Sequence, residues 1–273
     1  MPSKTGRSPS EYYKSDVSVE QSSNTGFDNT SRSIISGDGT SSSLLLGQRG
    51  VKITPNADSS ITFSTTNAGG SNIIAVDTAN EKVLVGASQT AANTQYTHFG
   101  MSYAEAATQG FVADTHYAIP FMMGNYGAVT ANYAMGSSTS SSFNDTNPAT
   151  SLTITNTAFS IIRCYWYVMD DITIDAVKWF HAADTATGED TAAHLMAYTV
   201  DIANGSTSGD LSSGTVVADG ANITNAGHEQ IYYQSMTVQS ANVNAGKVIL
   251  FTFASDTVNS DYSINATVKY HIR

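Results

Sequence analysis

The apolar and polar positions of the second half of the chain alternate in short runs. The clearest run is the last one, where apolar residues at 262, 264, 266, 268, 270 and 272 alternate with polar residues. A period of two is the pattern of a strand with one buried face and one solvated face. The same criterion predicts further strands at 116–123, 128–134, 152–156, 159–169, 172–181, 194–202, 231–238 and 247–253.

The run at 159–169 differs because it is apolar on both faces. Ile161 and Tyr167 fall on one face, and Cys164 and Trp166 fall on the other. We expect Cys164, the single cysteine, to be a buried small hydrophobe. In a two-layer fold something must cover the second apolar face. The candidates are a neighbouring subunit, a helix near Ser102 and the loop at 184–193.

One helix is expected, and it follows a polar linker at 89–100. Ser102 stands three residues before Glu105, which is the spacing of a capping box, and alanines follow. This pattern predicts a helix of about two turns. The other connections are polar loops, the largest being 184–193 and 204–227.

Many short strands and almost no helix predict an all-β fold for the C-terminal part. We expect residues 96–273 to form an antiparallel β-sandwich, because amphipathic strands bury their apolar faces by packing two sheets together. The number of strands favours a jelly roll. Strand spacing does not determine the order of the strands in the sheets.

The segment at 34–95 contains short β-prone pieces, none of which has enough apolar residues for a core. Its last part, 73–88, reads as two strands around a turn rich in Asp and Asn. One hairpin of this size cannot bury enough apolar surface to be stable. We therefore expect an intertwined β-shaft of three identical chains. The predicted trimer interface comprises Leu45, Val51, Ile53, Ile61, Phe63, Ile74, Val76, Val83 and Val85. The alternative is a β-meander packed on the C-terminal domain of the same chain.

The first 33 residues are polar and have few groups to bury. We expect them to form an extended arm that is held by a neighbouring molecule. Tyr12 and Tyr13 are the candidate anchors, because a tyrosine combines apolar area with a hydroxyl. The alternative is that both are incidental surface residues.

Residues 74–88 resemble a known sequence element. Ile74-Ala75-Val76-Asp77, Asn80, Lys82 and Val83-Leu84-Val85-Gly86-Ala87-Ser88 are similar to the element "VD…N.RVGIGT" of bacteriophage tail and head fibres. Lys82 stands in place of the usual Arg, and Leu84 and Ala87 depart from the pattern. In those fibres the element lies between an N-terminal shaft and a C-terminal head of a parallel homotrimer. The resemblance implies a virion location, attachment to the particle through the N-terminus and contact with a host surface through the C-terminal domain.

The charge distribution restricts the partners. The net charge is −11, and residues 83–273 carry five Lys and Arg against fifteen Asp and Glu. This excess of carboxylates disfavours nucleic acid and anionic membrane surfaces as partners of that part. The chain also has no apolar run of the roughly 18 residues that a membrane span needs, and its first residues do not form a secretory signal.

No motif for catalysis is present, so we expect no enzymatic activity and no cofactor. The segment Gly205-Ser206-Thr207-Ser208-Gly209 has Thr where a nucleophile elbow needs Ser. Two groups of acids could offer oxygen ligands to Ca²⁺, namely Asp170, Asp171 and Asp175, and Asp184, Glu189 and Asp190. Acids are also routine in β-turns, and we assign no metal.

Aromatic residues of the C-terminal part are candidates for contact with a host glycan. Trp179 and Tyr232 are the proposed receptor contacts, and alternation implies that only one of Tyr232 and Tyr233 faces outward. The sequence thus favours a homotrimeric bacteriophage fibre. Two alternatives stay open: a capsid decoration or cement protein with a lacing N-terminal arm, and a soluble carbohydrate-binding module.

Overall fold

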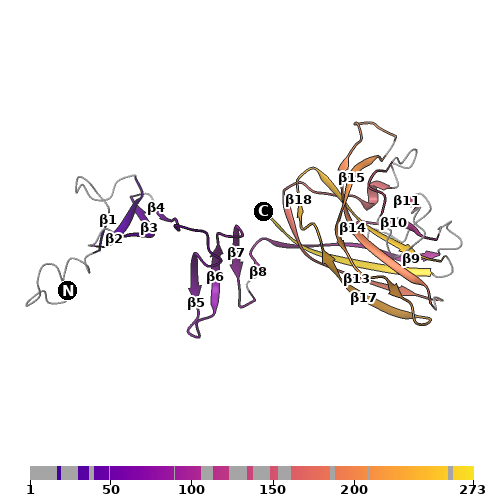
Figure 1. Cartoon of the computed structure of the whole chain (residues 1–273), viewed down its shortest axis with the longest axis horizontal. Coiled ribbons are helices and arrows are strands. Elements are labelled where there is room, and N and C mark those ends of the chain that lie inside the picture. Colours follow the sequence, from indigo (N-terminus) through magenta and orange to yellow (C-terminus); the bar gives the residue numbers. More distant parts are fainter. Residues whose placement is uncertain are drawn as a thin grey trace, which may run out of the picture. The chain divides into compact units, whose positions relative to one another are not determined.

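The computed structural model describes residues 17–19, 30–36, 40–48, 50–88, 90–105, 113–122, 134–137, 148–152, 161–184, 188–207, 209–257 and 261–273. The chain forms two compact units, Met1–Ala92 and Asn93–Arg273. They are called the N-terminal unit and the C-terminal unit below, and both can be followed in Figure 1.

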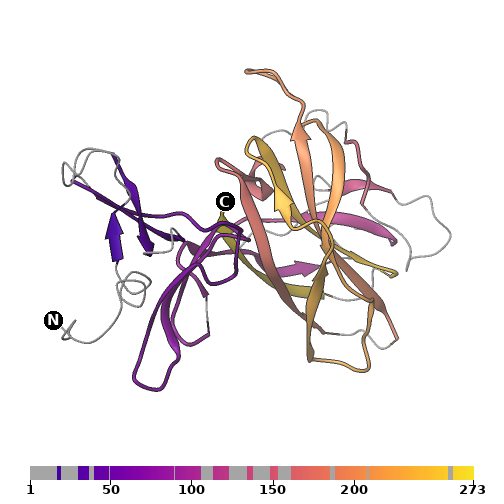
Figure 2. The same cartoon turned by 60° about the vertical axis from the view of Figure 1, so that its left-hand side comes forward.

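The C-terminal unit is built from eight principal strands. They are β9 (Thr94–Glu105), β10 (Thr115–Ile119), β13 (Ile172–Ala183), β14 (Asp190–Val200), β15 (Leu211–Asp219), β17 (Gln230–Val238), β19 (Lys247–Ser255) and β20 (Asp261–Ile272). Shorter strands join them at the margins: β11 (Ala134–Ser137), β12 (Trp166–Tyr167), β16 (Ile223–Thr224) and β18 (Asn242–Val243). Figure 2 shows the long strands from a second direction.

The principal strands form two four-stranded antiparallel layers. The order is β9-β20-β13-β17 in one layer and β10-β19-β14-β15 in the other, with a short pairing of β15 with β17 between them. The first principal strand therefore pairs with the eighth and the second with the seventh. This nested pairing is the double Greek key of a jelly roll. The expectation of an all-β sandwich of jelly-roll type is confirmed.

The core lies between the two layers. Phe99 of β9 and Trp179 of β13 approach Phe251 of β19, with ring centroids 6.0 and 6.2 Å apart. Phe253 of β19 lies 4.9 Å from the ring of Tyr262 on β20. Each of these five rings is buried. Edge-to-face and tilted pairs of this kind fill the space between layers and add to the energy of burial.

The alternation expected for the last strand is confirmed from Tyr262 to Val268 and then changes phase. His271 is buried, whereas Ile272 is exposed. The change accompanies a bulge in the neighbouring strand, because the register between β13 and β20 shifts between Ile174 and Ala176. A bulge adds one residue to one strand and re-aims the side chains beside it. The bulge residue Asp175 contacts His271 at 3.0 Å.

The prediction of a helix that begins near Ser102 is wrong for its first residues. Residues up to Glu105 continue β9, which pairs with β20 from His271 down to Asp261. Tertiary pairing over twelve residues outweighs a local capping pattern. The rest of the expected helix, at 106–112, lies outside the described residues.

The single strand expected at 159–169 is also wrong. Ile162–Cys164 forms a short 3-10 helix, η3, and only Trp166–Tyr167 pairs with β19 as β12. Cys164, Trp166 and Val168 are buried as expected, but Tyr167 and Met169 are exposed. One side of this segment therefore faces solvent in the single chain.

Two further differences concern loops and strand limits. The expected loop at 204–227 contains β15, which pairs with β14. The expected strands at 128–134 and 152–156 lie almost wholly outside the described residues, although Leu152 forms a bridge with Leu211.

The N-terminal unit contains two four-stranded antiparallel sheets, each with its strands in chain order. The first comprises β1 (Val17–Val19), β2 (Arg32–Ser36), β3 (Ser41–Gly47) and β4 (Gly50–Ile53). The second comprises β5 (Phe63–Thr66), β6 (Asn72–Asp77), β7 (Lys82–Val85) and β8 (Thr90–Ala91). Figure 1 shows β5, β6 and β7 side by side.

The hairpin expected at 73–88 is present as β6 and β7. Asp77 is buried and holds the turn, because its carboxylate accepts hydrogen bonds from the backbone N–H and the side-chain amide of Asn80, at 3.0 and 2.8 Å. The chain then reverses at Glu81, whose φ is 55°. Asp and Asn satisfy turn backbone in this way without a Gly. Among the described residues, no helix is long and apolar enough to span a membrane.

Candidate functional site

One face of the β5–β8 sheet is apolar and open to solvent. The backbone register pairs Phe63 with Val76, Val76 with Val83, and Ile74 with Val85. Directly paired residues of antiparallel strands share a face. Five residues of the expected trimer interface are thereby brought together on one surface, called the shaft face: Phe63, Ile74, Val76, Val83 and Val85. All except Val76 are between 39% and 45% exposed.

The N-terminal unit has almost no core of its own. Among its described hydrophobic residues, only Ala75 is buried, whereas the hydrophobic core cluster lies in the C-terminal unit. A small sheet needs a second apolar layer to be stable in water. The shaft face is therefore the candidate interaction site of this unit.

The β1–β4 sheet has a comparable face with a different membership. Leu44 pairs with Ile53 and Leu46 with Val51, whereas Leu45 pairs with Lys52. Leu45 consequently lies on the opposite face from Val51 and Ile53, and the three do not form one surface as the sequence suggested. Leu44 and Leu46 take its place, because the phase of alternation in a run of three leucines is set only by the pairing.

The remaining residues assigned to the N-terminal part lie outside these faces. Ile61 is exposed and precedes β5. Tyr12 and Tyr13 lie outside the described residues. The expected limit of the arm at residue 33 falls inside β2.

The expected receptor contact at Trp179 is wrong. Its ring is completely buried between the layers and stacks on His181 at 4.9 Å. Tyr232 is half-buried and stacks on the other side, 5.1 Å from the His181 ring. Its hydroxyl accepts a hydrogen bond from the N–H of Ala226 at 2.6 Å and donates one to Gln230 at 2.7 Å. Trp179 thus packs in the core, and Tyr232 stabilises the turn at 226–230.

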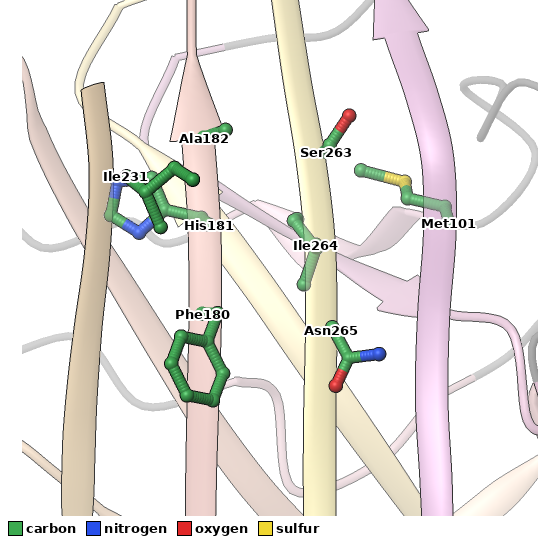
Figure 3. A pocket seen from close by; sticks show the side chains of 8 residues that line it. All are labelled: Met101, Phe180, His181, Ala182, Ile231, Ser263, Ile264 and Asn265. Carbon is green, nitrogen blue, oxygen red and sulfur yellow. The ribbon is translucent and has the colours of Figure 1, made fainter. Parts of the chain in front are cut away.

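The outward aromatics are the neighbours of these two residues. Phe180 is 42% exposed and Tyr233 is 70% exposed, and their rings stack with centroids 5.9 Å apart. Together with Ile231 they mark the outer face of the β9-β20-β13-β17 layer. Figure 3 shows Phe180 and Asn265 at the same level on neighbouring strands. Ile231 is on a third strand, further along, where it pairs with Ala182. The sequence pattern therefore identified the correct strands, but the outward position was assigned to the residue next to the one that is exposed.

The two groups of acids are used as structural acceptors. Asp171 accepts from the N–H of Ala245 at 2.8 Å, and Asp184 accepts from the N–H of Asp261 at 2.9 Å. Buried Glu189 accepts from the Tyr262 hydroxyl and from Thr257. Within the described part of the chain, no three His, Cys, Asp or Glu side chains form a group that could hold a metal ion.

Burial shifts the pKa of several interior groups. It lowers the pKa of His181 and of His194 to about 4, because a charged imidazolium loses its hydration inside the fold. Hydrogen bonding of His181 to Asn225, at 2.9 Å, opposes the shift. Burial also raises the pKa of the Cys164 thiol, which keeps it protonated and unreactive.

Comparison with known proteins supplies no family. No protein-family model matches the chain, and no curated protein matches it. A chain of the T13 IBDV viral particle matches in the solved structures with 9% sequence identity and a TM-score of 0.23. The match covers 91% of this chain and 64% of the viral chain. At that TM-score the likeness carries no argument.

Proposed function

We propose that this chain is a structural protein that assembles into a homotrimer through its N-terminal unit and displays three jelly-roll domains. The role is mechanical and adhesive rather than catalytic. The observation that supports it is the shaft face, five apolar side chains from three strands on a sheet whose unit has Ala75 as its only buried hydrophobic residue among those described.

Self-association is the simplest way to cover this face. Full burial of a large aliphatic or aromatic side chain is worth about 1.5–3 kcal/mol. Because four of the five side chains are still 39–45% exposed, covering them contributes roughly 1 kcal/mol each. Each copy contributes the same amount, so three copies around an axis gain several kcal/mol without any partner of another kind.

The resemblance of residues 74–88 to a fibre element supports three copies and a location in a virion. In this proposal residues 1–33 attach the trimer to the particle, residues 34–95 form the shaft and residues 96–273 form the head. Three heads would contact a host surface at the same time, and multivalency would raise the avidity above that of one head. Jelly rolls are common in capsid and lectin domains, which is a fold-level analogy only.

The assembly is tested by replacing Phe63. We expect the wild-type chain to sediment at three times the 28.8 kDa chain mass. Phe63→Asp should give monomers, because burying three converging carboxylates in an apolar interface is too costly. Ser64→Asp is the matched control, because Ser64 pairs with Ala75 on the opposite face of the same strand.

Sedimentation equilibrium distinguishes the outcomes. A Ser64→Asp trimer together with a Phe63→Asp monomer supports the shaft face as the interface. A wild-type monomer, or a trimer that survives Phe63→Asp, contradicts the proposal.

A further inference from the structure

The outer face of the β9-β20-β13-β17 layer has features of a binding surface for a ligand. Register pairs Phe180 with Tyr233 on one side and with Asn265 on the other. An open depression beside this row is lined by residues that include Ala182, Ile231 and Ser263 (Figure 3). Two aromatic rings, an aliphatic side chain and an amide therefore lie next to each other on a rigid sheet.

The aromatic pair provides an exposed apolar platform. The Phe180 and Tyr233 rings are inclined by 29° with their centroids 5.9 Å apart, and they are 42% and 70% exposed. Aromatic faces carry a partial negative charge. The C–H bonds on one side of a pyranose ring present weak positive charge, and such a ring can stack on this platform. Both aromatics are on paired strands, so their backbone is ordered before the ligand arrives, which limits the entropy lost on binding.

Two lysines lie beside the platform, although the unit as a whole is acidic. Lys178 and Lys269 are on the same outer face, and Lys178 is two residues from Phe180, about 7 Å along the strand. They are two of only five Lys and Arg residues in 83–273, against fifteen acids. Among the described residues, neither lysine contacts a carboxylate. Polar groups continue the face, where His98 hydrogen-bonds Thr267 at 3.2 Å.

Other classes of ligand fit this surface less well. Duplex DNA carries one negative charge per about 1.7 Å of helix axis, a density that two lysines on this face cannot neutralise. An extended peptide adds to a sheet at an unpaired edge, whereas Phe180 lies on β13, which is paired on both sides. A chain of acidic sugars offers both an apolar ring face for Phe180 and an anionic group for Lys178.

We propose that this face binds an anionic polysaccharide, with a pyranose stacked on Phe180 and Tyr233 and its carboxylate at Lys178. The inference names the ligand class for the head of the proposed fibre and rests on that adhesive role. It does not depend on how the N-terminal unit assembles.

The experiment is affinity electrophoresis of the full-length chain in gels containing polygalacturonate or uncharged dextran. We expect polygalacturonate to retard the wild-type protein and dextran to leave its mobility unchanged. Tyr233→Ala should weaken retardation at least tenfold, because the platform loses its more exposed ring. Lys178→Gln should weaken it and reduce its dependence on salt. Tyr167→Ala is the matched control, since Tyr167 is an exposed tyrosine on β12, in the other layer.

Sedimentation of the same samples separates this inference from the proposed assembly. Retardation lost in Tyr233→Ala with unchanged oligomeric mass supports the binding face. Absence of retardation in the wild type, equal retardation by dextran, or equal loss in Tyr167→Ala overturns it, even if the trimer is intact. A change of oligomeric mass in Tyr233→Ala also overturns it, because the face would then be a subunit interface.

Discussion

At the scale of single residues, positions 179–181 show that neighbouring residues of one strand face opposite sides of the sheet. Trp179 and His181 point into the core, and Phe180 between them points outward. The three residues are similar enough in polarity that the sequence does not determine which of them is inside. The inward set makes an aromatic stack that includes the imidazole of His181, from which we predict that the C-terminal unit is sensitive to acid.

The acid sensitivity can be predicted with its sign. The pKa of His181 falls from 6.5 to about 4 on folding, so the folded state favours the neutral ring. Stability from this residue is fully present above about pH 6.5 and is lost as the pH falls toward 4. The loss is on the order of 3 kcal/mol. The Nδ1 atom of His181 has no hydrogen-bond partner among the described residues, so no acceptor awaits the added proton.

Urea unfolding at pH 7.5 and at pH 4.5, followed by tryptophan fluorescence, measures this effect, because both tryptophans are in the C-terminal unit. The difference in unfolding free energy between the two pH values should shrink in His181→Gln. An unchanged difference would show that His181 is not responsible, and His194 would be the next candidate.

At the scale of elements, the strands that the sequence missed have identifiable causes. The first, β9, pairs along its length with β20 and on its other side makes, among the described residues, only a bridge between Phe99 and Phe121. Its polar residues make the run look like a linker in the sequence. The second, β15, has the sequence LSSGTVVAD, whose Ser and Gly residues are typical of loops. In both cases pairing with a long neighbour supplies what local propensity lacks.

The glycine within β15 is required by packing. A Cβ atom at Gly214 would lie 2.4 Å from Cε1 of Tyr198 and 3.0 Å from the Cα of Thr150. The Tyr198 ring cannot move away easily, because it is buried and its hydroxyl donates to the carbonyl of Ala149 at 2.9 Å. We expect Gly214→Ala to lower the free energy of unfolding by about 1–3 kcal/mol.

Chemical denaturation monitored by tryptophan fluorescence tests this expectation. Ser212→Ala is the control on the same strand and should stay within about 0.5 kcal/mol of the wild type. Equal stability of Gly214→Ala and the wild type would contradict this expectation and mean that the Tyr198 ring adopts another conformation without loss of stability.

At the scale of the whole molecule, the apolar residues are divided unequally between the two units. The C-terminal unit buries a continuous cluster between its layers. The N-terminal unit presents apolar residues on the shaft face. It presents others on one face of the β3–β4 pair, namely Leu44, Leu46, Val51 and Ile53. The C-terminal unit therefore has a core of its own, whereas in the proposed trimer the N-terminal unit obtains its second apolar layer from identical chains.

This division predicts the behaviour of a fragment. Residues 93–273 alone should fold with native-like tryptophan fluorescence and sediment as a monomer, because the core is intact and the shaft face is absent. A trimeric fragment would place assembly in the C-terminal unit instead of the shaft face.

The sequence by itself determined the β class, most strand positions of the C-terminal unit, the hairpin at 73–88 and the set of apolar residues on the shaft face. These follow from local alternation and turn chemistry, which act over a few residues. Tertiary structure alone decided the jelly-roll order, the strands β9 and β15, the side of the sheet taken by Leu45 and the exchange of Trp179 for Phe180 at the surface. Each of these depends on the register between strands distant in the chain, because a shift of one residue turns every side chain to the other face.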